Sequence, residues 1–156
     1  MELYCIYQIK KGPAGKPGKV TDMIDMEKIN YKEEAEKWIT NEGPMDMADI
    51  LVDVLESDAF DGNSYYDKLY YADKLARELR KYMFYVINGS NNESEVFQFD
   101  SIDEAVDKAD IIWNHLTIQE RLNRELIVAF GTPTHEEIEN GYLPAEGYSI
   151  FKKYSK

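Results

Sequence analysis

The fold is decided by residues 82–99, YMFYVINGSNNESEVFQF, which predict two strands joined by a turn. Residues 82–87 are rich in aromatic and β-branched side chains, which favour a strand. Asn88-Gly89 is typical of a hairpin turn, here within a slightly longer loop, and residues 95–99 supply the partner strand. The stretch therefore predicts a strand pair at the start of the second half of the chain.

Downstream of this pair, helix-capping signals alternate with strand signals. Ser101 with Glu104 predicts a helix to about residue 116, and Thr117 with Glu120 predicts a short further helix. Residues 126–130 suit a buried strand, residues 135–140 a helical turn, and residues 148–153 a last strand.

Upstream, the same order of elements is expected. Residues 3–9 and 19–26 predict two strands, joined by a Gly- and Pro-rich hairpin tip over 12–18. Three helices should follow: one capped by Asn30 with Glu33, one over about 45–56, and one capped by Ser64 with Asp67 that runs to about residue 81. The predicted fold class is α+β, a mostly antiparallel sheet covered by helices.

Three segments organise the chain, and we expect them to form one compact domain. They are a strand-strand-helix unit over 1–43, an acidic helical hairpin over 44–81, and a second strand-strand-helix unit with C-terminal strands over 82–156. The fragments Glu34-Ala35 and Glu104-Ala105 each lead into a Trp-bearing helix. They are too short to decide whether the two units are a duplication.

Composition indicates a globular cytoplasmic protein. The single cysteine, Cys5, can form no internal disulfide, and its alternation with apolar residues favours a core thiol. The chain has neither the basic and apolar regions of a signal peptide nor an apolar run of the roughly 20 residues that cross a bilayer. The formal net charge of −12 disfavours direct binding of nucleic acid.

The negative charge is concentrated in particular segments. The first twenty residues carry a local charge of +3, whereas residues 38–67 contain eight acids and no base. Residues 82–107 contain six further acids and again no base.

Two predicted helices project rows of carboxylates. On the second helix, the inner stripe comprises Met47, Ile50, Leu51, Val54 and Leu55, and the opposite row comprises Asp46, Asp49, Asp53 and Glu56. Asp58 and Asp61 continue the acidic segment. The helix from Ile102 carries a second row with Asp103, Asp107 and Asp110. These acids are the candidate partner-binding residues.

Three interpretations of the acidic rows remain open. They can serve solubility, or Lys74, Arg77 and Lys81 of the third helix can neutralise the first row. They can also attract Lys and Arg clusters of a partner and compete with phosphate for the same groove.

Tyrosines give a second candidate surface. Tyr65-Tyr66 and Tyr70-Tyr71 are adjacent pairs on the third helix, so one member of each pair should be partly exposed. We take Tyr66 and Tyr71 as candidate partner contacts.

The chain contains no recognised catalytic or cofactor motif, and we expect neither a metal nor another cofactor. His115 and His135 have no flanking Cys, and the loop around Gly62 lacks the carboxylates of a calcium-binding EF-hand, although weak cation binding there stays open. A hydrolase based on paired carboxylates is the remaining enzyme hypothesis.

The segment Trp113-Asn114-His115-Leu116-Thr117, followed by Glu120-Arg121, resembles segments of short proteins carried by phages and mobile elements. The small acidic α/β profile also resembles the anti-CRISPR and anti-restriction inhibitors that such elements encode. This resemblance implies an inhibitor that occupies a nucleic-acid-binding groove with carboxylates, as a DNA mimic does.

We therefore expect a non-catalytic acidic inhibitor of a nucleic-acid-handling host complex, and its partner would be a basic nuclease or nucleic-acid-binding protein. The alternative is an accessory or regulatory domain that recognises a partner through its Tyr-rich surface.

Overall fold

The computed structural model describes residues 23–91 and 93–155. The strand predicted over 3–9, the loop over 12–18 and most of the strand predicted over 19–26 lie outside these residues. Residues 23–26 themselves are not in a strand. The chain divides into two compact units, Met1–Arg80 and Lys81–Lys156.

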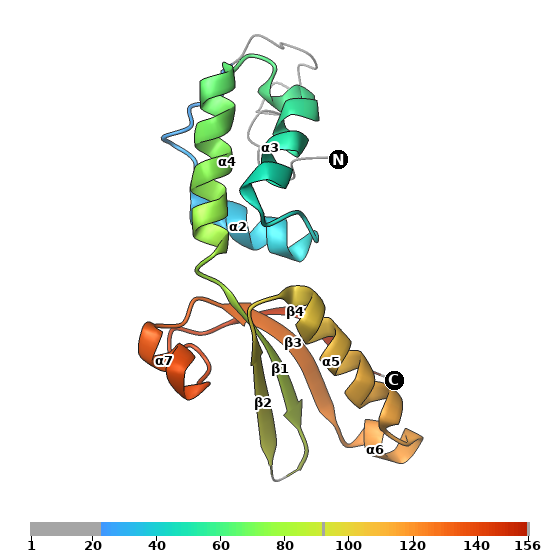
Figure 1. The fold of residues 1–156 in the computed structure, drawn as a ribbon. Helices are drawn as coiled ribbons and strands as arrows, with labels where there is room; N and C mark the ends of the chain where they lie inside the picture. The colour runs from blue at the N-terminus through green and yellow to red at the C-terminus, as the bar shows by residue number, and fades with distance from the viewer. Residues whose placement is uncertain (1–22, 92, 156) are drawn as a thin grey trace. The chain divides into compact units, whose positions relative to one another are not determined.

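The described part of the first unit is helical. It contains α2 (Tyr31–Thr40), α3 (Met47–Glu56), the short 3₁₀ helix η1 (Asp58–Phe60) and α4 (Tyr65–Leu79). Both α2 and α3 pack against α4 (Figure 1).

Side-chain caps start these helices at the predicted places. The Asn30 side chain accepts a hydrogen bond from the backbone N–H of Glu33, and the Ser64 side chain accepts one from Asp67. The start of α3 differs from the expected residue 45, because Asp46 caps the helix by accepting from the N–H of Ala48. Such caps satisfy backbone donors that the first helical turn leaves unpaired.

Aromatic residues fill the core between α2, η1 and α4. Trp38, Phe60, Tyr71 and Leu75 are all nearly or fully buried. The rings of Phe60 and Tyr71 lie 4.9 Å apart between centroids, in a tilted arrangement that aromatic pairs favour.

The second unit is built on a four-stranded antiparallel sheet with the order β2-β1-β3-β4. Its strands are β1 (Met83–Gly89), β2 (Ser94–Phe99), β3 (Glu125–Gly131) and β4 (Ser149–Tyr154). Together with the helices of both units, this sheet confirms the α+β fold class.

The predicted turn at Asn88-Gly89 is wrong. Both residues belong to β1, where Asn88 lies opposite Glu95 of β2 and Leu126 of β3. The turn follows the end of β1 at Gly89, and the N–H of Ser90 donates to the carbonyl of Glu93 at 2.8 Å. Pairing on both sides of β1 holds Asn88-Gly89 in the ladder despite its local turn preference.

Helices contact both faces of this sheet. α5 (Ile102–His115) lies on the face that carries Phe97 and Tyr154, because Lys108 stacks over the Phe97 ring and Trp113 contacts the Tyr154 ring. α6 (Ile118–Leu122) follows α5. α7 (His135–Asn140) lies on the opposite face, where the side chain of Gln98 donates to the carbonyl of Ile138 (Figure 1).

Candidate functional site

The solvent side of α3 combines aliphatic and acidic side chains. We define the α3 face by its exposed residues Ala48, Asp49, Val52, Leu55 and Glu56. At 100° per residue these residues span an arc of about 120°. Val52 is 50% exposed and Leu55 is 47% exposed, so two aliphatic side chains lie on the solvent side of this helix. The face is therefore more than a solvated row of charge.

Leu55 was predicted in the inner stripe, and the structure corrects this. The buried side of α3 is centred on Ile50 and Val54, both completely buried, whereas Met47 and Leu51 are only partly covered. The inner side is therefore turned away from Leu55 and towards Asp53.

Asp53 is the acid of the predicted row that does not face solvent. Its side chain is only 8% exposed, and within the described residues its Oδ2 atom has no hydrogen-bond partner. Burial raises the pKa of the Asp53 carboxyl, and the neighbouring carboxylates of Glu56 and Asp49 raise it further. The prediction of Asp53 as a partner contact is corrected, because this carboxylate lies in the rim of the core.

The other acids of this segment are exposed. Asp46 caps α3, Asp58 begins η1, and Asp61 directly follows η1 at its C-cap. Asp49 and Glu56 lie together on one side of the exposed aliphatic pair of α3, next to Val52. Of the six acids on and beside α3 that were predicted as partner contacts, five are thus exposed: Asp46, Asp49, Glu56, Asp58 and Asp61.

Arg77, one of the three bases that could have neutralised the α3 row, pairs within its own helix. Its Nε atom lies 3.0 Å from a carboxylate oxygen of Asp73, four residues earlier on α4. This pair is exposed, so it contributes little to stability.

Tyr71 is not a surface residue, which corrects its prediction as a partner contact. Its ring is completely buried, and its hydroxyl donates to Oε1 of the buried Glu34 at 3.1 Å. The indole N–H of Trp38 in turn donates to the Tyr71 hydroxyl oxygen at 3.1 Å. These bonds tie α2 to α4 and give Tyr71 a structural role.

Tyr66 is exposed as predicted, with 81% of its surface accessible. Tyr65 and Tyr70 on the same helix are also exposed. The expectation that each tyrosine pair has a partly exposed member is therefore confirmed, and Tyr70 takes this position in place of Tyr71.

The acids of α5 are divided between solvent and the sheet. Asp103 and Asp107 are exposed, whereas Asp110 accepts a hydrogen bond from the Tyr154 hydroxyl and lies 3.9 Å from Nζ of Lys152. Burial, followed by this contact, raises the pKa of Tyr154 above its ordinary value. Asp110 therefore anchors β4 to α5.

Both histidines make local contacts. A ring nitrogen of His115 lies 2.8 Å from the carbonyl oxygen of Ile111, and Nε2 of His135 lies 3.1 Å from Glu139. Across residues 23–91 and 93–155, no group of three or more His, Cys, Asp or Glu side chains is placed to hold a metal ion. In the same residues, no helix combines the length and apolarity that crossing a membrane requires.

Comparison of the chain with protein-family models, with curated proteins and with solved structures found no match.

Proposed function

We propose that this protein is a non-catalytic protein-binding module that docks through the α3 face onto a basic surface of another protein. The observation that carries the proposal is the exposure of Val52 and Leu55 next to Asp49 and Glu56. Specific interfaces combine apolar with polar groups, and on this face the exposed aliphatic pair lies beside a carboxylate edge formed by Glu56 and Asp49.

The charge around the face selects the partner. Residues 38–67 contain eight acids and no base, so the neighbourhood of α3 attracts a cationic surface. Lys and Arg clusters that bind phosphate are such surfaces, because carboxylates and phosphates accept the same charge-assisted hydrogen bonds. We infer that the partner is a nuclease or nucleic-acid-binding protein and that docking inhibits it by occupying its phosphate-binding groove. This is the anti-CRISPR or anti-restriction type of action, within a cytoplasmic setting.

A photo-crosslinker placed at position 52 tests the proposal. With Val52 replaced by a benzophenone amino acid, the protein should crosslink to one basic partner in a lysate of its own cells. The same amino acid at Ile150, a similarly exposed position in the second unit, is the matched control. The captured protein should then be purified, and its binding to duplex DNA should be lost when this chain is added in excess. A crosslinked partner that is not basic, or that binds DNA equally well in the presence of this chain, would contradict the proposal.

A further inference from the structure

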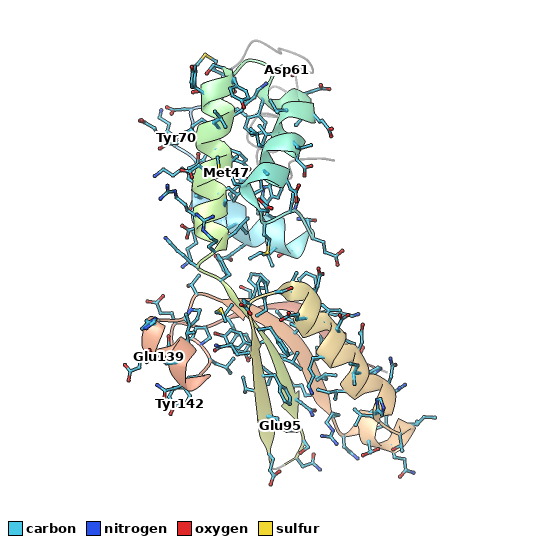
Figure 2. All side chains as sticks on the ribbon, viewed as in Figure 1. Met47, Asp61, Tyr70, Glu95, Glu139 and Tyr142 are labelled. Carbon is cyan, nitrogen blue, oxygen red and sulfur yellow. The ribbon has the colours of Figure 1, made fainter. Side chains whose placement is uncertain are left out.

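A second surface with its own chemistry lies at the start of α4. The segment of residues 23–27 runs past the first two turns of this helix and leaves an open cavity of about 520 Å³. We call it the α4 groove, and it is lined by Met23, Asp25, Glu27, Tyr66, Asp67 and Tyr70, among others. Tyr70 projects from the side of α4 that faces away from α3 (Figure 2). The groove is therefore distinct from the α3 face.

Buried hydrogen bonds fix the walls of the groove. The Asn63 side chain, which is 93% buried, accepts from the N–H of Ile24 at 3.1 Å and donates to its carbonyl at 2.9 Å. The same amide nitrogen lies 3.1 Å from Oδ2 of Asp67. At the other end of the segment, the Tyr31 hydroxyl donates to the carbonyl of Met26 at 2.9 Å. The groove is thus held open by contacts that need no ligand.

All charged side chains among the described lining residues are acids. Asp25, Glu27 and Asp67 supply three carboxylates, and Tyr66 and Tyr70 supply two exposed aromatic rings. The Tyr70 ring already accepts a cation, because Nζ of Lys74 lies 5.6 Å from its centroid. Carboxylates that bond a cation and aromatic rings that stack on it are the two elements of a site for a cationic side chain.

We propose that the α4 groove holds the guanidinium group of an arginine side chain presented by a partner protein. A guanidinium is planar, so it stacks on Tyr66 or Tyr70 while its N–H groups reach carboxylates on both walls. A lysine ammonium is a compact, strongly hydrated charge and uses the aromatic wall less well. The three carboxylates would repel an anionic ligand, and a purely apolar ligand would displace water from them without replacing its hydrogen bonds.

The test uses the full chain, labelled with ¹⁵N, and the peptide acetyl-Gly-Arg-Gly-Arg-Gly-amide as the probe. As the peptide is added, the backbone amide signals of Asp25, Glu27 and Tyr66 of the protein should shift until they saturate. The same peptide with citrulline, an uncharged isostere of arginine, should bind at least tenfold more weakly, and the lysine peptide at least threefold more weakly.

Variants localise the binding. Tyr66→Ala and Glu27→Gln change exposed side chains and should each weaken the arginine peptide at least threefold. Tyr142→Ala and Glu146→Gln make the same changes at exposed positions of the second unit and should leave its affinity unchanged. The proposal is overturned if the citrulline peptide binds as well as the arginine peptide. It is equally overturned if the groove variants match the wild type, or if the shifts follow acidic residues throughout the chain.

This inference does not depend on the proposed function of the α3 face. The neutral variant Leu55→Ser should abolish docking at α3 without changing the affinity of the arginine peptide. Failure of one proposal therefore leaves the other measurable.

Discussion

The indole nitrogen of Trp38 on α2 donates a hydrogen bond to the Tyr71 hydroxyl on α4 across 3.1 Å, inside a core where both side chains are buried. Removing that hydroxyl with Tyr71→Phe takes the acceptor from the indole and a donor from the Glu34 carboxylate. A buried indole N–H that loses its acceptor costs about 1–3 kcal/mol, so the free energy of unfolding should fall by that amount. Urea denaturation followed by the NMR signal of the Trp38 indole measures it. An unchanged unfolding midpoint would show that the network carries no stability.

Tyr85 of β1 provides the matched comparison. Its ring is also completely buried, but within the described residues its hydroxyl has no hydrogen-bond partner. Burial raises the pKa of Tyr85 to about 12, and the Glu137 carboxylate adds to the effect. Tyr85→Phe should therefore leave stability unchanged or raise it by up to about 1 kcal/mol. Urea denaturation followed by the NMR signal of the Trp113 indole reports on this unit, and a loss above about 1 kcal/mol would mean that the hydroxyl is bonded in solution.

The raised pKa of the Asp53 carboxyl predicts that the free energy of unfolding depends on pH. Because the folded state raises the pKa of this carboxyl, its favourable contribution is present below the ordinary Asp value of about 3.9 and is lost as pH rises through the raised value. Asp53→Asn removes like-charge repulsion with Asp49 and Glu56, each pair costing about 0.2–0.5 kcal/mol. Unfolding in urea should therefore show a gain of about 0.4–1 kcal/mol at pH 7 that shrinks towards pH 4. Asp49→Asn removes one of these repulsive pairs but also the acid that the N-terminus of α3 favours by about 0.3–1 kcal/mol, so it should give no net gain. A destabilised Asp53→Asn variant at pH 7 would contradict the assignment.

Gly43 packs closely against the core residue Trp38 and leaves no space for a side chain. A Cβ atom at this position would stand 2.5 Å from Cε3 of Trp38, whose side chain is 1% exposed. Gly43→Ala should therefore destabilise the first unit by about 1–3 kcal/mol, the usual cost of overpacking. Gly89→Ala is the control, since its Cβ would have no neighbour closer than 3.6 Å. Thermal unfolding of both variants checks this, and equal melting temperatures would refute the predicted clash.

The sequence predicted helix starts well because capping is local. Ser101, Thr117 and Thr134 each accept from the N–H three residues later, and both Thr caps form complete capping boxes. The predicted position of the turn was wrong because Asn88 and Gly89 pair with both neighbouring strands, which the local sequence does not show. The strands expected over 3–9 and 19–26 fall largely outside the described residues.

The candidate site was less predictable, because burial depends on which neighbour covers a helix. The apolar arc of α3 includes Leu55. The buried side of the helix is nevertheless centred on Ile50 and Val54, and it includes Asp53 instead of Leu55. The pairing of Tyr70 with Tyr71 showed that one ring would be exposed, but only the position of Trp38 and Glu34 selects Tyr71 for burial. The width of the predicted apolar stripe of α3 was the one sign in the sequence that an aliphatic side chain of this helix would be exposed to solvent.

Binding of a basic partner by the acids of the α3 face should make the affinity depend on salt. With the crosslinked partner purified, its dissociation constant should be measured by calorimetry at 50 and 500 mM salt. We predict at least tenfold weaker binding at high salt, because ion pairs at the rim are screened. Asp49→Lys with Glu56→Lys should abolish binding at both salts, whereas the same charge change through Glu136→Lys with Glu146→Lys should largely preserve it. Equal affinity at the two salt concentrations, together with full binding by the α3 double variant, would contradict the account.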